Sequence, residues 1–102
     1  MNERTERIPP HNLEAEESLL GAMLLSRDAI ADALEIVTAE QFYRPAHAHI
    51  FEAISALYAE GDAVDPVTVA EVLDRSGVLE QVGGLDALLS LQVNTPATSN
   101  AA

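Results

Sequence analysis

The side chains that could do chemistry in this chain are carboxylates and imidazoles that fall on apolar helix faces. On a helix predicted near the start of the chain, Glu16 lies inside the apolar arc. On a later predicted helix, His47 lies on the apolar side, whereas His49 points the other way, to solvent. Helical geometry, with about 100° between successive residues, sets these positions. A buried carboxylate or imidazole is costly unless a hydrogen-bonding partner satisfies it.

Three interpretations of these residues compete. In the first, Glu16 pairs with His47 or with Arg44, and the pair determines how two helices dock. In the second, the residues form a catalytic dyad, which would need a neighbouring nucleophile or pocket that the sequence does not indicate. In the third, His47 and His49 hold a metal ion, but on a helix their rings diverge by about 200° and cannot share one. We favour the structural pair of Glu16 and His47.

Several kinds of chemistry are excluded by residue types that the sequence lacks. The chain has no Lys, so it cannot form a Walker-type phosphate-binding loop. It has no Cys, which excludes disulfides and cysteine-based zinc sites. Gly83 and Gly84 are interpreted as a helix break, not as a phosphate cradle. We therefore expect no catalytic residue, cofactor or metal site in this segment.

The charge balance bears on possible partners. The chain has seventeen acidic residues and five basic ones, all Arg, which gives a formal net charge of -12. A surface this negative repels phosphate backbones, so we expect no direct binding of nucleic acid. An acidic face suits a basic protein partner, although acidity also favours solubility. Glu14 and Glu17 are candidates for a partner surface, but negative charge in a first helical turn also complements the helix dipole, which is the interpretation we favour.

Capping residues and glycine breaks predict an all-α fold. Expected helices cover residues 13–25, 27–37, 45–59, 66–76 and 85–93, with short turns near 39–43 and 78–82. Apolar spacing predicts which faces point inward. The second helix should bury Ile30, Ala33, Leu34 and Val37, and the third should bury a stripe made of Ile50, Phe51, Ile54, Leu57 and Tyr58.

Residues 65–91 permit an alternative function. They give a helix, a glycine turn, a short helix, a glycine break and another helix, as a helix-turn-helix might. However, Arg75 is the only basic residue after Arg44, and a recognition helix without positive charge is a poor one. A small DNA-binding regulator of helix-turn-helix type is kept as the alternative, and the missing motifs disfavour a free-standing enzyme.

Five sequence blocks, in order, resemble the N-terminal domain of DnaB-type bacterial replicative helicases. They are IPPHNLEAEESLLG at 8–21, FYRPAH at 42–47 followed by IF at 50–51, VDPVT at 64–68, LEQVGG at 79–84 and NTPA at 94–97. The resemblance covers nearly the whole chain. It implies a compact orthogonal bundle of about five to six short helices, without the helical hairpin that follows in the family. Residues 1–12 would be a flexible arm, 13–96 the helical head, and 97–102 the start of the connection to that missing hairpin.

The resemblance also implies a function. The segment would be the collar domain of a hexameric ATP-dependent DNA helicase, and it would mediate subunit assembly and docking of primase. Its expected partners are neighbouring helicase subunits and the C-terminal helicase-binding domain of primase. ATP and Mg²⁺ would be bound by a motor domain elsewhere in the parent chain, which we expect in the cytoplasm and not in a membrane. The family often has an aromatic residue shortly after the paired glycines, where this chain has Ala87, so a partner contact there would be weaker or differently built.

Overall fold

The structure is a computed structural model that describes residues 12–93. Within that range the chain forms six α-helices and a single 3-10 turn, with no strand, which confirms the all-α fold class. The elements are α1 (Leu13–Leu25), α2 (Arg27–Ile36), η1 (Ala39–Gln41), α3 (Pro45–Ala59), α4 (Pro66–Arg75), α5 (Leu79–Val82) and α6 (Gly84–Val93). The predicted arm, apart from Asn12, and the predictions for residues 94–102 lie outside the described residues.

Side-chain caps mark the starts of α1, α2 and α4. The Asn12 side chain accepts a hydrogen bond from the Ala15 N–H at 3.0 Å, and Ser26 caps α2 in the same way. At the start of α4, Asp65 and Thr68 each accept the other's backbone N–H, both at 2.9 Å. These bonds satisfy N–H groups that a helix cannot pair internally. Because caps are local, the helix starts predicted from sequence agree with the structure to within one residue.

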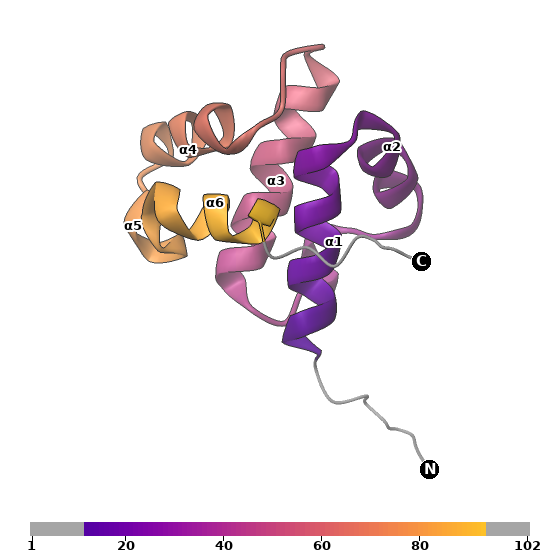
Figure 1. Cartoon of the computed structure of the whole chain (residues 1–102), viewed down its shortest axis with the longest axis horizontal. Helices are drawn as coiled ribbons and strands as arrows, with labels where there is room; N and C mark the ends of the chain where they lie inside the picture. Colours follow the sequence, from indigo (N-terminus) through magenta and orange to yellow (C-terminus); the bar gives the residue numbers. More distant parts are fainter. Residues whose placement is uncertain (1–11, 94–102) are drawn as a thin grey trace.

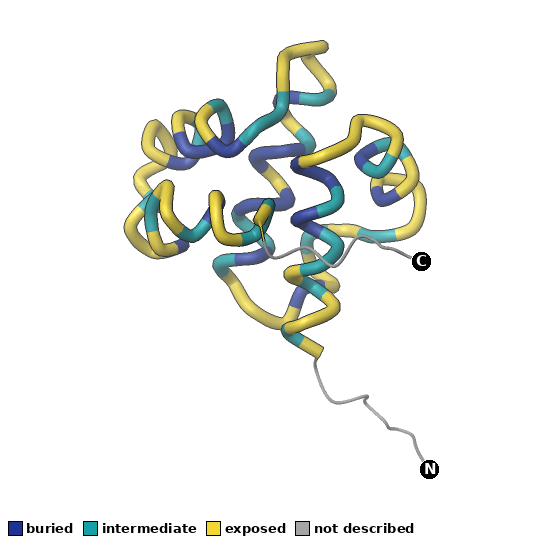
Figure 2. Tube along the Cα trace, in the orientation of Figure 1, coloured by how far each residue is buried: buried dark blue, intermediate teal, exposed yellow. Residues whose placement is uncertain are grey.

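The central element of the fold is α3, which packs against α1, α2, α4, α5 and η1 (Figure 1). Its buried residues run along most of its length, and the other helices place their buried sides around it (Figure 2). The largest fully buried side chains are Leu20, Met23, Ile30, Ile50, Ile54, Val69, Leu73 and Leu88. Since these residues come from α1, α2, α3, α4 and α6, they join the helices into one core.

Two predictions about helix faces need correction. Leu34 was expected in the core but is 36% exposed, whereas Ile30 and Ala33 of the same helix are buried. The reason is that α2 lies at the side of the bundle and packs mainly on α1 and α3, so only a narrow strip of its surface is covered (Figure 1). Conversely, His49 was expected to face solvent but is only partly exposed, because the central helix is covered from several sides.

The turn between α5 and α6 depends on paired glycines. Gly83 has φ 102° and Gly84 has φ 76°, values that residues with a Cβ rarely adopt. At Gly83 an added Cβ would also lie only 2.9 Å from the Cβ of Ala87. The absence of a side chain therefore lets α6 fold back closely on the end of α5.

Replacing Gly83 with Ala should lower the free energy of unfolding by about 2–3 kcal/mol, because left-handed backbone strain of about 1–2 kcal/mol is added to the contact with Ala87. Gly77→Ala is the matched control, since Gly77 has φ 79° but open space around its missing Cβ. It should lose only the strain contribution. Urea unfolding followed by far-UV circular dichroism measures both. Equal losses would show that the contact with Ala87 has no energetic role.

Candidate functional site

Glu16 of α1 and His47 of α3 meet between the two helices. The distance between His47 Nδ1 and Glu16 Oε1 is 2.7 Å. The His47 side chain is 5% exposed and the Glu16 side chain 14%. The structure thus brings together the two polar residues that the sequence placed on apolar faces.

Glu16 also binds backbone N–H groups just before α3. The Tyr43 N–H donates to Glu16 Oε2 at 2.6 Å, and the Arg44 N–H lies 3.5 Å from Oε1. The contact between Glu16 and Arg44 thus uses the backbone N–H of Arg44, and the side-chain partner of Glu16 is His47. Sequence reasoning missed both backbone contacts. The start of a helix at Pro45 indicates only that the N-cap N–H of Arg44 lacks an internal acceptor, and no sequence signal marks the N–H of Tyr43.

These hydrogen bonds decide the ionisation of Glu16. Burial by itself raises the pKa of Glu16, but the hydrogen bonds from Tyr43, His47 and Arg44 together outweigh it. The pKa of Glu16 is consequently held below its ordinary value of 4.5. An ionised carboxylate can only accept hydrogen bonds, so His47 Nδ1 must carry a hydrogen.

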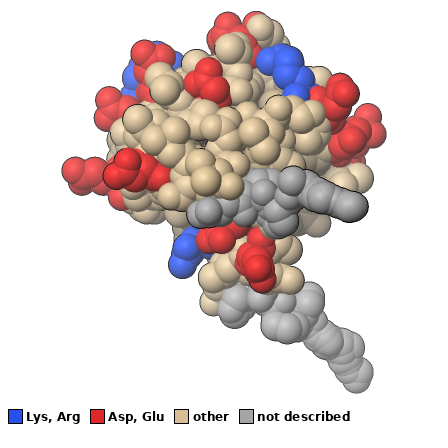
Figure 3. Space-filling view, in the orientation of Figure 1, with Lys and Arg blue, Asp and Glu red and all other residues tan. Residues whose placement is uncertain are grey.

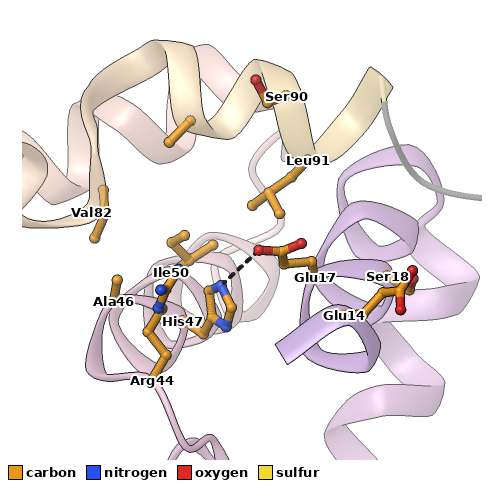
Figure 4. A pocket seen from close by; sticks show the side chains of 11 residues that line it. Glu14, Glu17, Ser18, Arg44, Ala46, His47, Ile50, Val82, Ser90 and Leu91 are labelled. Atoms are coloured by element: carbon orange, nitrogen blue, oxygen red, sulfur yellow. Dashed lines mark ion pairs between the residues drawn. The ribbon is translucent and has the colours of Figure 1, made fainter. Parts of the chain in front are cut away.

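A cleft of about 410 Å³ opens beside His47, between α1, α3 and α6 (Figure 4). Its apolar lining includes Ile50, Val82 and Leu91, and its charged lining consists of Glu14, Glu17 and Arg44. The two carboxylates come from α1, whereas Arg44 immediately precedes α3. The cleft therefore combines an apolar interior with a rim that is negative on balance.

The two residues proposed for a partner surface both line this cleft. Glu14 and Glu17 are exposed, and Glu17 Oε2 lies 4.0 Å from His47 Nε2. Ala87, which stands where the family often has an aromatic residue, lines the same cleft from α6. Contact of these residues with a partner remains a prediction.

One face of the domain carries scattered acidic groups. On the face shown in Figure 3, acidic side chains lie mainly around the margin, and a largely uncharged area occupies the middle. Exposed apolar residues of α6 include Leu85, Leu89 and Val93, with 38%, 40% and 78% exposure. This distribution suits protein contacts, because apolar area with a polar surround is typical of interaction surfaces.

Two negative findings apply to residues 12–93. No group of three or more His, Asp or Glu side chains in this range is arranged to hold a metal ion. In the same part of the chain, none of the helices has both the length and the apolar character needed to cross a membrane.

Comparison with known proteins places this geometry in a family. The family model described as DnaB-like helicase N terminal domain matches residues 8–102. The chain is 50% identical over 95 residues to the replicative DNA helicase DnaB of Mycobacterium leprae (strain TN), covering 93% of this chain and 16% of that protein. It is 45% identical over 96 residues to the replicative DNA helicase DnaB of Leifsonia xyli subsp. xyli (strain CTCB07), covering 94% and 21% respectively.

A solved structure agrees with these matches. The crystal structure of the N-terminal domain of DnaB helicase from Mycobacterium tuberculosis superposes with a TM-score of 0.84 at 50% identity. That alignment covers 87% of this chain and 64% of the other. The chain thus spans only a small part of the helicases that it matches, and the match falls on their N-terminal domain. By sequence and by fold, the chain belongs to the family of DnaB-like helicase N-terminal domains.

Proposed function

We propose that this domain is the collar domain of a hexameric replicative DNA helicase, in which it mediates subunit assembly and docks the C-terminal helicase-binding domain of primase. The observation that carries the docking role is the cleft between α1, α3 and α6, which is already open in the domain on its own. Its volume of about 410 Å³ falls in the range of sites that take a ligand or an inserted side chain. Its acidic rim suits a basic partner.

In the longer protein, this domain and a separate motor domain would have different functions. This domain supplies contact surfaces and no catalytic residue. A motor domain elsewhere in the protein binds ATP and Mg²⁺, hydrolyses ATP and grips DNA. The whole protein is an ATP-dependent DNA helicase that works in the cytoplasm.

An NMR titration of the ¹⁵N-labelled chain with the C-terminal domain of primase from the same organism tests the docking role. We expect the largest amide shifts at residues that line the cleft, such as Glu17 and Ser90. The physical reason is that partner binding there would bury polar and apolar lining together. An absence of shifts at about 1 mM primase domain, where even weak complexes form, would contradict docking by this domain.

The same chain can be tested against the alternative of a DNA-binding regulator. The helix in the position of a recognition helix is α6, and it contains Asp86 but no basic residue. We therefore expect no binding to duplex or single-stranded DNA at low salt. Affinity that falls steeply as salt rises would favour the regulator and count against the collar.

A further inference from the structure

A smaller groove, separate from the cleft, lies between α1 and the end of α2 with η1. Its lining consists of Ala15, Glu16, Leu19, Ile36, Val37, Gln41 and Phe42, around a volume of about 260 Å³. Figure 1 shows α1 and α2 side by side, and the two helices pack on each other. Helical geometry puts Ala15 and Leu19 on a different flank of α1 from Glu14 and Glu17, which line the cleft.

The polar groups that line this groove are already engaged within the domain. The Glu16 carboxylate takes part in the hydrogen bonds described above. Gln41 Oε1 accepts the Thr38 N–H at 2.8 Å. The open surface that remains is largely hydrocarbon, since Val37 is half-buried and Ile36 is 74% exposed. An occupant would therefore gain mainly by burying apolar surface, which favours an apolar side chain.

The sequence outside the described residues offers one such side chain near the groove. Residues 94–102 (NTPATSNAA) contain no large apolar side chain. In residues 1–11, Ile8 is the only large aliphatic side chain apart from Met1. The volume of the groove is below the roughly 300 Å³ at which pockets for small molecules begin, so it suits one or two side chains.

The length of the connecting chain lets Ile8 reach the groove. Leu19 lies seven residues after the N-cap Asn12, which is about 10 Å along the helix axis. Ile8 lies four residues before Asn12, and an extended chain spans about 13 Å over that separation. The chain can therefore fold back along α1 and place Ile8 beside Leu19. The two prolines at 9 and 10 restrict the connecting backbone, so docking costs less chain entropy.

We propose that the groove is the docking site of the chain's own N-terminal arm, with Ile8 packed against Leu19 and Ile36. The arm would then be held on the domain, whereas the family resemblance implies a flexible one. Because the groove and the cleft use different flanks of α1, the docked arm leaves the cleft open. The inference does not depend on primase docking, so failure of one leaves the other intact.

A nitroxide spin label on the arm of the full chain tests this docking. The chain has no Cys, so Thr5→Cys gives a single labelling site. We expect the label to cause a strong loss of the amide signals of Val37 and Gln41, which returns when the nitroxide is reduced. Ser76 is the reference, because it follows α4, which packs on α3, α5 and α6. Its amide signal should keep its full intensity.

Substitutions in the labelled chain show whether the groove itself holds the arm. Ala15→Glu places a charge in the groove at an exposed helix position, and we expect the signals of Val37 and Gln41 to recover. Ile8→Ser should have the same effect. Ala56→Glu is the matched control, since Ala56 is an exposed alanine of α3 outside the groove, and the signal loss should persist. Signal loss that is absent from the start, or that survives both Ala15→Glu and Ile8→Ser, would overturn the proposal.

A mixed sample separates the chain's own arm from the arm of a second copy. It combines ¹⁵N-labelled chain without nitroxide and spin-labelled chain without ¹⁵N. We expect full amide signals from the ¹⁵N-labelled chain in this sample. Loss of the Val37 and Gln41 signals there would place a neighbouring copy's arm in the groove and overturn the assignment to the chain's own arm.

Discussion

Replacing Ile54 with Ala is expected to lower the free energy of unfolding by about 3–4 kcal/mol, the usual cost of removing a large side chain from a packed core. Ile54 is 0% exposed and lies on α3, the helix that packs against α1, α2, α4, α5 and η1. A domain of this size has a total stability of about 5–15 kcal/mol, so the loss would remove a large part of it. Urea unfolding followed by far-UV circular dichroism measures the change.

Ile36→Ala is the control for that experiment. It deletes the same atoms, but Ile36 is 74% exposed at the end of α2. Substitutions at such surface positions usually change stability by no more than about 0.5 kcal/mol. If the two variants unfolded alike, α3 would not be the centre of the core, and the packing described for it would be wrong.

Replacing Glu16 with Ala is expected to cost about 2–3 kcal/mol of unfolding free energy. The change removes the acceptor for His47 and for the N–H groups of Tyr43 and Arg44. Unsatisfied buried groups cost about 1–3 kcal/mol each. Tyr43 and Arg44 are exposed residues, so water can replace part of what their N–H groups lose, and the total stays below the sum of three bonds.

The pH dependence of a Glu16→Gln variant separates the charge of Glu16 from its packing. A carboxylate whose pKa is lowered in the folded state stabilises the fold fully above its unfolded pKa, and that stabilisation is lost as pH falls through the folded pKa. The stability gap between the unaltered chain and Glu16→Gln should therefore be constant above about pH 5 and shrink below the ordinary value of 4.5. Unfolding curves measured between neutral pH and about pH 3 test this, and a gap that stayed constant would contradict it.

The helix pattern was accessible from sequence because its signals are local. Asn12, Pro45 and the pair Asp65-Pro66 start helices where expected, since a cap acts on N–H groups within its own first turn. The prediction for Leu34 was wrong because burial depends on contacts between helices, which are not local in the sequence. Apolar spacing gives the direction of a buried face, but the width of that face depends on which neighbours cover it, as it does for α2 beside α1 and α3.

The candidate site was accessible only in part. Glu16 and His47 stood out because polar residues on apolar faces are unusual, and their meeting could be proposed from that alone. The N–H groups of Tyr43 and Arg44 could not be found in this way. Every residue except proline has a backbone N–H, and residue type does not indicate which of them donates a hydrogen bond to a side chain. The cleft also escaped prediction. It depends on the position of α6 relative to α1 and α3, and no short sequence pattern determines that distance.

The bonds of Glu16 also have a consequence for the order of folding. Its carboxylate joins α1 to Tyr43 across 27 residues and to His47 across 31, so each bond closes a loop that spans α2 and η1. Closing such loops costs chain entropy before any contact compensates. We therefore expect these bonds to form late, after local helices have appeared, and to break only when α1 separates from α3. The Tyr43 amide would then exchange its hydrogen with solvent at the rate of that separation, although the residue itself lies at the surface.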